Sequence, residues 1–384
     1  NWPYHKQTGY VWWIRRVRHA LGIYDLLRID IHDWVGERFF LCALDEAQYV
    51  KNPAALVTRA VKRVEAEHRF ALTGTPMENR LSELWSIFDY LMPGFLYGYD
   101  SFKKKFETPI VKNDDESAMT RLQKMVSPFI LRRLKEDVLK DLPDKLEKDM
   151  FSPLESEQKE LYEAHTERFR LMLGMQSDAE FRTSKLQILA EITRLRQICC
   201  YPGLVYEGYK GNSSKLEMCM ELVQNAVNGG HKILLFSQFT TMLDVLAVRL
   251  KKAKVSFYML TGSTSKEKRA QMVHAFNEDD TSVFCISLKA GGTGLNLTAA
   301  DIVIHYDPWW NLAVQNQATD RAHRIGQQNV VSVYRLFMKD TIEERIRALQ
   351  ERKRELADEI LSGEGIGQAL ISREEVLELL GKRE

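Results

Sequence analysis

The sequence predicts an α/β protein with two lobes, each built on a parallel sheet. From residue 231 onward, short apolar runs alternate with amphipathic stretches. A smaller unit of the same kind occupies residues 39–72, and mostly helical residues, from 81 to about 225, separate the two. Since alternating strands and helices favour a parallel, doubly wound sheet, we expect two α/β lobes with helical insertions between them.

In the first lobe, residues 39–44 and 69–72 are apolar runs short enough to be buried strands. The following segment predicts a helix, because its apolar residues recur at helical spacing and form one core-facing stripe. That stripe consists of Leu81, Leu84, Trp85, Phe88 and Leu91. Further helices are expected near residues 157–175 and 181–199, in a region interrupted by prolines.

The second lobe shows the alternation most clearly. Apolar runs at residues 232–236, 257–260, 283–287, 302–306 and 330–337 predict strands. Between the first two runs, Met242, Leu243, Leu246 and Leu250 fall on one face of a helix. The tail from residue 342 is charged and amphipathic, and its charges predict a solvated helical face.

Composition narrows the class of protein. The net charge is +1, so any contact with nucleic acid must come from local basic patches. The five cysteines form no CxxC pair, which predicts reduced thiols in an intracellular protein. No apolar segment is long enough to cross a bilayer, so we expect a cytoplasmic protein, associated with the nucleoid if its source is bacterial. The chain opens with Asn1, and we expect the true N-terminus to lie upstream.

Three polar residues near the second lobe's end point to nucleotide chemistry. Gln317, Arg321 and Arg324 are spaced by four and three residues, which predicts that they share one face of one helix. Two guanidiniums that stay charged suit the negative charge that develops on a transferred phosphoryl group. The alternative is a solvated helix whose arginines are ordinary surface charge.

A carboxylate pair follows the first predicted strand. Asp45 and Glu46 leave the carboxyl end of residues 39–44, which is where α/β sheets place ligands. One carboxylate can hold Mg²⁺ through water while the other activates the attacking water. The alternative is that Asp45 only caps the next helix. Thr73 and Thr75 follow the second strand on a tight turn, although a plain turn would look the same.

A glycine-rich loop, AGGTGLNL at residues 290–297, follows the strand at 283–287. Backbone at Gly292 and Gly294 can approach a nucleotide closely, because glycine has no side chain in the way. Two tryptophans, Trp309 and Trp310, come before the arginine-bearing segment and are expected to pack in the core or to stack on a ligand.

Taken in order, these motifs resemble the Swi/Snf-type helicase-like ATPases of superfamily two, in particular their bacterial branch. The resemblance rests on DEAQ from Asp45, LTGTP from Leu72, LLFSQF from Leu234, SLKAGGTGLNLTAAD from Ser287, and DPWWN followed by QATDRAHRIGQ. It implies two RecA-like lobes that close around ATP and Mg²⁺ and translocate along double-stranded DNA, with a DNA-bound protein complex as a further partner and no membrane.

The resemblance also implies a role for each motif residue. Asp45 would coordinate Mg²⁺ through water and Glu46 would activate the attacking water. Thr73 and Thr75 would couple nucleotide state to DNA. From the second lobe, Gln317 would complete the nucleotide site with Arg321 and Arg324 as arginine fingers, while Gly292 and Gly294 approach the nucleotide. Lys289 and Trp310 would contact DNA, through sequence-independent and salt-sensitive interactions.

One expected motif is missing. No GxxxxGK[ST] phosphate-binding loop occurs in the 384 residues. Residues 1–23 resemble the family segment that leads into this loop, and residues 24–31 resemble a segment that follows it, so we expect an internal deletion between Ile23 and Tyr24. The first lobe would then have an incomplete sheet with an exposed edge and low stability.

These observations predict five segments and leave three functions open. The segments are the remnant before the loop (1–23), an incomplete first lobe with a helical protrusion (24–150), a helical protrusion and linker (151–225), the second lobe (226–340) and a helical tail (341–384). The first possible function is that of a DNA-stimulated ATPase and duplex translocase impaired by the missing loop. The second is that of a non-catalytic module that binds DNA or a partner. The third possibility is a gene remnant without function.

Overall fold

A computed structural model gives the fold. It describes residues 38–73, 81–113, 115–131, 139, 141–291, 295–309, 312–348, 351 and 373–381. These residues form two compact units, one within residues 38–131 and the other from residue 139 onward. Each unit is described by itself below.

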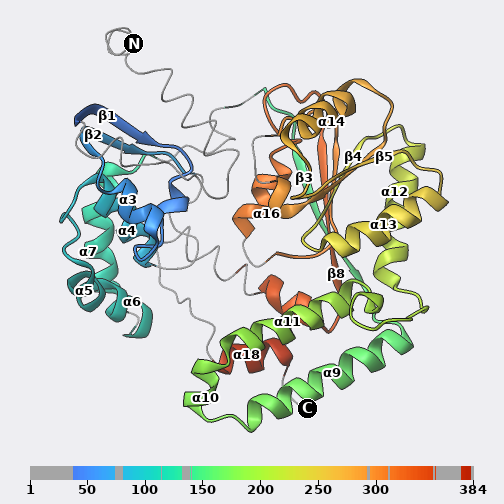
Figure 1. The fold of residues 1–384 in the computed structure, drawn as a ribbon, viewed down its shortest axis with the longest axis horizontal. Coiled ribbons are helices and arrows are strands. Elements are labelled where there is room, and N and C mark those ends of the chain that lie inside the picture. The colour runs from blue at the N-terminus through green and yellow to red at the C-terminus, as the bar shows by residue number, and fades with distance from the viewer. Residues whose placement is uncertain are drawn as a thin grey trace. The chain divides into compact units, whose positions relative to one another are not determined.

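The first unit contains a two-stranded parallel sheet and a group of helices (Figure 1). Strands β1 (Arg38–Leu44) and β2 (Glu65–Ala71) are joined through the short helices η2 (Ala47–Val50) and α3 (Leu56–Val61). Helix α4 (Leu81–Leu91) packs the fully buried Tyr90 against Leu44, Ala47 and Val50, with Leu91, the last residue of the predicted stripe, partly buried beside it. The two predicted strands of this lobe are therefore present and pair in parallel.

The remaining helices of the first unit form a core of their own. They are α5 (Tyr99–Phe102), η3 (Lys103–Glu107), α6 (Thr108–Asn113), α7 (Glu116–Val126) and η4 (Ser127–Phe129). Leu81, Leu84, Trp85 and Phe88 of α4 face this core, as their spacing predicts. Asp115 caps α7 by accepting a hydrogen bond from the Ala118 N–H.

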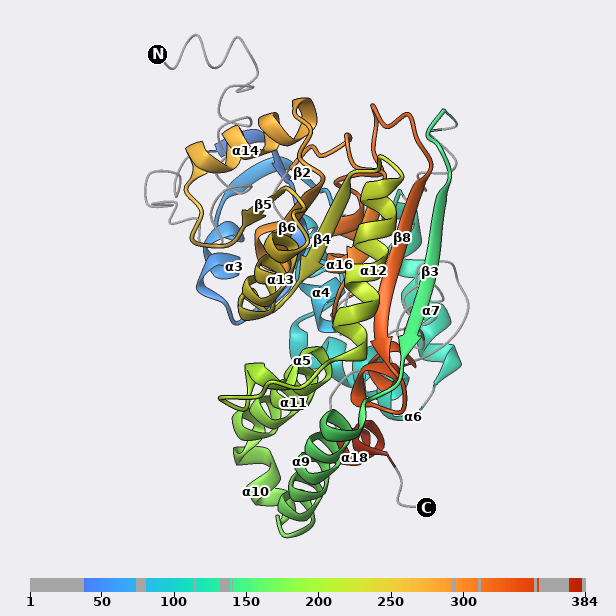
Figure 2. The ribbon, with the colours of Figure 1, turned by 90° about the vertical axis from the view of Figure 1, so that its right-hand side faces the viewer.

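The second unit is built on a six-stranded parallel sheet in the order β3-β8-β7-β4-β6-β5 (Figure 2). Its strands are β3 (Lys145–Ser152), β4 (Ile233–Ser237), β5 (Phe257–Leu260), β6 (Val283–Ser287), β7 (Ile302–His305) and β8 (Val331–Met338). Every residue of β4 and β6 is buried, which explains why both strands are apolar up to their final serines, Ser237 and Ser287. The predicted strands of the second lobe are all present.

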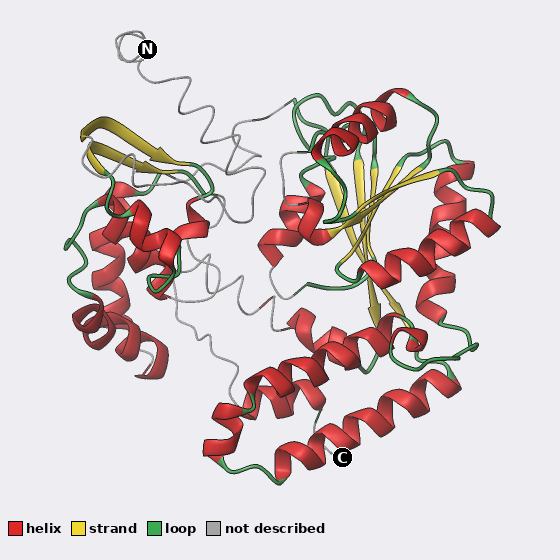
Figure 3. Ribbon diagram, viewed as in Figure 1, coloured by secondary structure: helices red, strands yellow, loops and turns green. Residues whose placement is uncertain are grey.

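Helices cover both faces of this sheet (Figure 3). One face packs on α12 (Ser214–Asn228) and α13 (Thr240–Lys252). The other packs on α14 (Lys266–Glu278) and α16 (Leu312–Thr319), with the short helix α15 (Leu288–Gly291) after β6. A separate helical layer contains α9 (Ser156–Gly174), α10 (Asp178–Thr183), α11 (Lys185–Cys200), η5 (Pro202–Leu204) and α18 (Arg373–Leu380).

Strand β3 lies in the second unit, whereas the sequence-based segments place residues up to 150 in the first lobe. It pairs with β8 from Lys145↔Val331 to Ser152↔Met338. Charged side chains on this edge strand hide its β character from a search for apolar runs. Asp149, for example, accepts a 2.6 Å hydrogen bond from Arg335 of β8.

A buried ion pair fixes α12 to the residues that follow β8. The Lys215 ammonium lies 2.7 Å and 2.6 Å from the two carboxylate oxygens of Glu343, and neither side chain is exposed to solvent. Glu343 also accepts a hydrogen bond from the Met338 N–H. Burial is the largest single effect and favours the neutral amine, but the charge and hydrogen bonds of Glu343 and the nearby Cys200 and Cys199 together outweigh it and raise the pKa of Lys215. Among the described residues, no helix is long and apolar enough to span a membrane.

Candidate active site

The carboxyl ends of β1 and β2 bring the predicted residues of the first unit together. Asp45 and Glu46 follow β1 directly, and Thr73 lies two residues beyond β2. Two backbone hydrogen bonds connect these segments, because the Leu72 N–H donates to the Leu44 carbonyl and the Ala47 N–H donates to the Leu72 carbonyl. The acidic pair and the threonine therefore share one edge of the sheet, where parallel α/β sheets place their ligands.

Gln48 joins Glu46 to Thr73 through its side-chain amide. The Gln48 Nε2 donates to the Glu46 carboxylate at 2.6 Å, and the Thr73 hydroxyl donates to Gln48 Oε1 at 2.6 Å. All three side chains are half-buried. The sequence analysis missed Gln48 as a site residue, although it is the last residue of the DEAQ motif. Its amide can serve both partners because it offers a donor and an acceptor.

The backbone of Glu46 adopts a left-handed conformation, with φ 54° and ψ 50°. This region disfavours residues with a side chain by about 1–2 kcal/mol. Glu46 precedes η2, but its side chain makes no capping hydrogen bond to that helix. The Glu46 N–H instead donates to the Asp45 carboxylate at 3.2 Å. Local backbone strain of this kind often occurs where a side chain is held for function.

The arginine-bearing segment of the second unit is not one helix. Helix α16 ends at Thr319, and residues 320–326 form turns, so the prediction that Gln317, Arg321 and Arg324 share a helix face is wrong. The backbone tightens after Thr319, where the Arg321 N–H donates to the Ala318 carbonyl three residues earlier. Gly326 then adopts a φ of 102°, which ends any helical continuation.

The turn that carries both arginines is tied to the residues after the glycine-rich loop. The Leu297 N–H donates to the Arg321 carbonyl, and Arg324 Nη1 donates to the Leu295 carbonyl at 3.0 Å. Arg321 is only 9% exposed, while Arg324 and Gln317 are half-buried. Tertiary contacts, rather than helical spacing, hold this part of the motif in place.

Gln327 anchors the same turn from inside. Its side-chain amide donates to the carbonyls of Thr298, Ala300 and Ala322 at 2.8–3.2 Å. Its Oε1 accepts from the N–H groups of the two following residues. Because Gln327 is buried, these bonds satisfy backbone groups that water does not reach.

A buried arginine from the helical layer meets the ends of β4 and β7. Arg196 of α11 donates to Gln238 Oε1 at 3.0 Å and to the Pro308 carbonyl, and it lies 3.9 Å from the Asp307 carboxylate. Asp307 also accepts from the Ser237 hydroxyl at 2.5 Å. Burial raises the pKa of Asp307, against the opposing charge of Arg196. This network fixes Asp307 and Pro308, shortly after β7.

His305, at the end of β7, is buried beneath α16. Its Nε2 lies 2.9 Å from the Thr319 hydroxyl, and its ring stacks on Phe236. Burial lowers the pKa of His305 to about 3, helped by the positive charge of Arg335. The ring is therefore neutral at pH 7 and acts as a packing and hydrogen-bonding group.

Four of the predicted site residues, Thr75, Gly292, Gly294 and Trp310, lie outside the described residues. Lys289 lies in α15. Asp45, Glu46 and Thr73 come together in the first unit, and Gln317 and the two arginines belong to the second. Within the described ranges, no group of three or more His, Cys, Asp or Glu side chains is placed to hold a metal. A larger group of protein ligands is not needed for Mg²⁺ that binds with a nucleotide, because waters and phosphate oxygens supply the other ligands. Asp45 can provide the one carboxylate that such a site uses.

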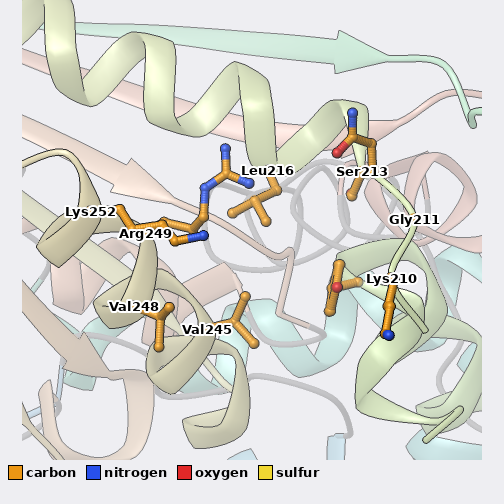
Figure 4. A pocket seen from close by; sticks show the side chains of 10 residues that line it. Lys210, Gly211, Ser213, Leu216, Val245, Val248, Arg249 and Lys252 are labelled. Carbon is orange, nitrogen blue, oxygen red and sulfur yellow. The ribbon is translucent and has the colours of Figure 1, made fainter. Parts of the chain in front are cut away.

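A pocket of about 320 Å³ lies between α13 and the start of α12 (Figure 4). Its lining includes Lys210, Arg249 and Lys252 but none of the predicted site residues. Arg249 is already paired with Glu217 at 2.7 Å. This pocket is therefore distinct from both parts of the candidate active site.

Two family patterns match the chain in sequence. The SNF2-related domain matches residues 24–204, and the helicase conserved C-terminal domain matches residues 214–326. The chain belongs to the Swi/Snf (SNF2) family of helicase-like ATPases. The first match begins at Tyr24, the residue after the expected deletion.

Several relatives extend this result. An uncharacterized ATP-dependent helicase of Mycoplasma pneumoniae is 39% identical over 93% of the chain, and YwqA of Bacillus subtilis is 41% identical over 90%. The TATA-binding protein-associated factor MOT1 of Saccharomyces cerevisiae is 35% identical over 93%. The chain spans 34%, 38% and 22% of these proteins, respectively.

Two solved structures are similar in fold. The SWI2/SNF2 ATPase core domain of Sulfolobus solfataricus is 36% identical, with a TM-score of 0.53, and the same core in complex with dsDNA is 34% identical, with a TM-score of 0.50. The match covers 94% of this chain and 74% of either archaeal chain. These neighbours identify the α/β units as RecA-like lobes of a SNF2 ATPase core.

Proposed function

We propose that the chain is the part of a DNA-stimulated ATPase and double-stranded DNA translocase that carries the water-activating and arginine motifs. Hydrolysis by this chain alone is impaired, because its sequence contains no phosphate-binding loop. The activity is that of its family, and the missing segment concerns how the phosphates are held and how complete the sheet of the first lobe is.

The hydrogen-bonded series from Glu46 through Gln48 to Thr73 carries this proposal. A carboxylate that orients the attacking water needs a fixed position, and the Gln48 amide restrains it at 2.6 Å. The same amide accepts from Thr73, so a shift of the segment after β2 changes the environment of Glu46. That link is the physical basis for coupling hydrolysis to movement on DNA.

ATP and Mg²⁺ fit the two sets of residues. Asp45 would hold Mg²⁺ through water, and a bound Mg²⁺ would neutralise negative charge on the phosphates. Arg321 and Arg324 would stabilise the charge that develops on the transferred phosphoryl group. Gln317 would orient the nucleotide beside them. Glu46 would take the proton from the attacking water.

Double-stranded DNA is the proposed track, with support from the archaeal core whose structure is described as a complex with dsDNA. The DNA backbone, which carries no sequence information directly, would be contacted by Lys289, Trp310 and the glycine-rich loop.

The MOT1 relative is named for its association with the TATA-binding protein. A DNA-bound protein complex is accordingly proposed as a further partner.

Two measurements on the purified chain test this function. Duplex DNA binding by fluorescence anisotropy should weaken linearly on a log–log plot against salt, and Lys289→Ala should reduce the slope by about one. ATP turnover by the chain alone should stay near background with or without DNA. Failure to bind duplex DNA at low salt would contradict the translocase assignment.

Glu46→Gln serves as the matched control for the turnover measurement, because it keeps the size of the side chain and removes its charge. DNA-stimulated turnover by the unmodified chain that disappears in Glu46→Gln would mean that another group holds the phosphates. The proposed impairment would then be wrong.

A second candidate is a non-catalytic module that binds DNA or a partner through the second lobe. The completeness of the six-stranded sheet favours it, since this unit has both faces covered and does not need the missing loop to fold. Salt-sensitive DNA binding that Glu46→Gln leaves unchanged, together with no turnover under any condition, would favour the module.

A further inference from the structure

The pocket between α13 and the start of α12 has an apolar floor. Leu216 of α12 and Val245 of α13 line it and also border the core of the second unit. Val248, one turn further along α13, lines the same pocket and is 58% exposed. The pocket therefore offers apolar surface to a ligand from solvent, on a unit whose own core is already packed.

The rim of this pocket is positively charged. Among the described residues that line it, Lys210, Arg249 and Lys252 are basic and none is acidic. Arg249 is paired with Glu217, and the Glu157 carboxylate lies beside the backbone of Gly211. Within the described part of the chain, the two lysine side chains form no ion pair or hydrogen bond. Both are exposed, so their charges are available to a ligand.

The loop that forms the other side of the pocket is held in place by its own contacts. The Tyr201 ring packs edge-on against Tyr209, with the ring centroids 5.5 Å apart. The Tyr209 hydroxyl donates to the Asn212 carbonyl at 2.9 Å, and the buried Ser213 hydroxyl donates to the Cys200 carbonyl at 3.3 Å. Because these contacts exist without a ligand, binding needs little further ordering of the loop.

An acidic segment with a bulky apolar side chain matches both features. In Figure 4, Lys252 and Lys210 lie on opposite sides of the apolar side chains. An apolar side chain can fill the floor while carboxylates before and after it meet the two lysines. The volume of about 320 Å³ is at the lower end of the range for ligand sites, about 300–1,000 Å³, which suits one or two side chains. Duplex DNA is a poorer match, because contacts to its charged backbone gain nothing from an apolar floor.

We propose that this pocket binds an acidic segment of a partner protein, through a bulky apolar side chain with carboxylates on both sides. The inference goes beyond the proposed ATPase function, since no lining residue belongs to either part of the candidate active site. The partner would be held by the second unit alone, and its binding would require neither ATP nor DNA.

A phage-displayed library of random short peptides supplies the probe. The library is first depleted on a variant that carries both Val248→Asp and Lys252→Glu, and then selected on the unmodified chain. Peptides with acidic residues on both sides of a phenylalanine, leucine or similar residue should be enriched. Enrichment of peptides without acidic residues, or no enrichment at all, would overturn the proposal.

Fluorescence anisotropy of an enriched, labelled peptide then locates the site. Val248→Asp should weaken binding at least about tenfold, because it places a carboxylate against the apolar side chain of the peptide. Val330→Asp is the matched control, since Val330 is 47% exposed in the same unit and lies outside the pocket. It should change binding by less than about twofold.

A second pair of variants tests the charge at the rim. Lys252→Glu should weaken binding about fivefold or more, because it replaces an exposed ion pair by a repulsion. Lys251→Glu makes the same change at the neighbouring position of α13, outside the lining, and should have an effect of less than about twofold because salt screens the more distant charge. All the substituted side chains are exposed, so the variants should fold like the unmodified chain.

The outcomes separate the pocket from other surfaces. Weaker binding in Val248→Asp and Lys252→Glu, but not in their controls, supports the proposal. Equal effects of Lys252→Glu and Lys251→Glu would mean general attraction to the basic end of α13 and would overturn the pocket. If both lining variants weaken binding of duplex DNA and leave binding of the peptide unchanged, the pocket belongs to a DNA interface and the proposal is wrong.

Discussion

Removing the positive charge of Lys215 should strongly destabilise the second unit. Lys215 and Glu343 are both fully buried, and two contacts of 2.6–2.7 Å join them. In Lys215→Met, the Glu343 carboxylate stays buried with the Met338 N–H among its hydrogen-bond donors but without its counter-ion. Breaking a buried pair from one side lowers the free energy of unfolding by about 3–5 kcal/mol. That is a large part of the about 5–15 kcal/mol that stabilises a typical domain.

Urea unfolding followed by circular dichroism measures this loss in the full chain. Hydrogen exchange of α12 and β4, read by mass spectrometry, assigns it to the second unit. Arg249→Met is the matched control, because the Arg249–Glu217 pair has a similar distance of 2.7 Å but partly exposed side chains. An exposed pair of this kind contributes less than about 1 kcal/mol.

A double variant completes the test. Lys215→Met with Glu343→Leu should regain most of the lost stability, since an apolar pair of similar volume leaves no buried charge. A loss in Lys215→Met no larger than that in Arg249→Met would refute the reasoning. It would mean that water or another cation reaches Glu343 when Lys215 is absent.

Three further changes test other features. Because the pKa of His305 is about 3 in the fold, stability should fall by about 1.4 kcal/mol per pH unit below pH 6.5, where the unfolded chain takes up the proton. His305→Gln should remove this slope in urea unfolding at pH 7 and pH 5, and an unchanged slope would contradict a buried neutral ring. Gln327→Leu should destabilise the arginine-bearing turn by about 2–3 kcal/mol and speed hydrogen exchange at residues 320–329, and unaltered exchange would contradict its anchoring role. Glu46→Gly should stabilise β1 by about 1 kcal/mol, because glycine adopts the left-handed backbone without strain. Slower hydrogen exchange in β1 would show this gain, and a loss of stability would argue against strain.

Burial explains which strands could be read from the sequence. Strands β4 and β6 are enclosed on both faces, so each begins with four apolar residues in a row and their positions were predictable. Strand β3 lies at the edge of the sheet and carries charged residues such as Glu147 and Asp149, which pair with Arg335. An edge strand of this composition has no apolar signature, so the sequence analysis assigned residues 145–150 to the first lobe and residues 151–152 to the linker.

The candidate site was predictable in its chemistry but not in its local geometry. The position of Asp45 and Glu46 after an apolar run was enough to place them at the carboxyl end of a strand. The spacing of Gln317, Arg321 and Arg324 suggested one helix, but after Thr319 the backbone changes to irregular turns that contact residues 295–300. Spacing along the chain contains no information about such contacts.

Gln48 and Arg196 are site residues that the sequence analysis missed. The amide of Gln48 is informative only once β1 and β2 are known to be neighbours. Arg196 lies in a segment that reads as an ordinary amphipathic helix, and its partner Asp307 is more than one hundred residues later in the sequence. Both residues act through long-range contacts that only the fold reveals.

The pairing of β3 with β8 has a consequence for synthesis of the protein. Asp149 and Arg335, which face each other across these strands, are separated by 186 residues. At a ribosomal rate of about 5–20 residues per second, β3 waits about 10–40 s after it is made before its partner exists. During that interval Leu146 and Met150 lack their final neighbours, and the nascent chain offers a strand edge to any other polypeptide nearby. The charges along β3 therefore protect the unfinished protein from aggregation as well as stabilising the finished sheet.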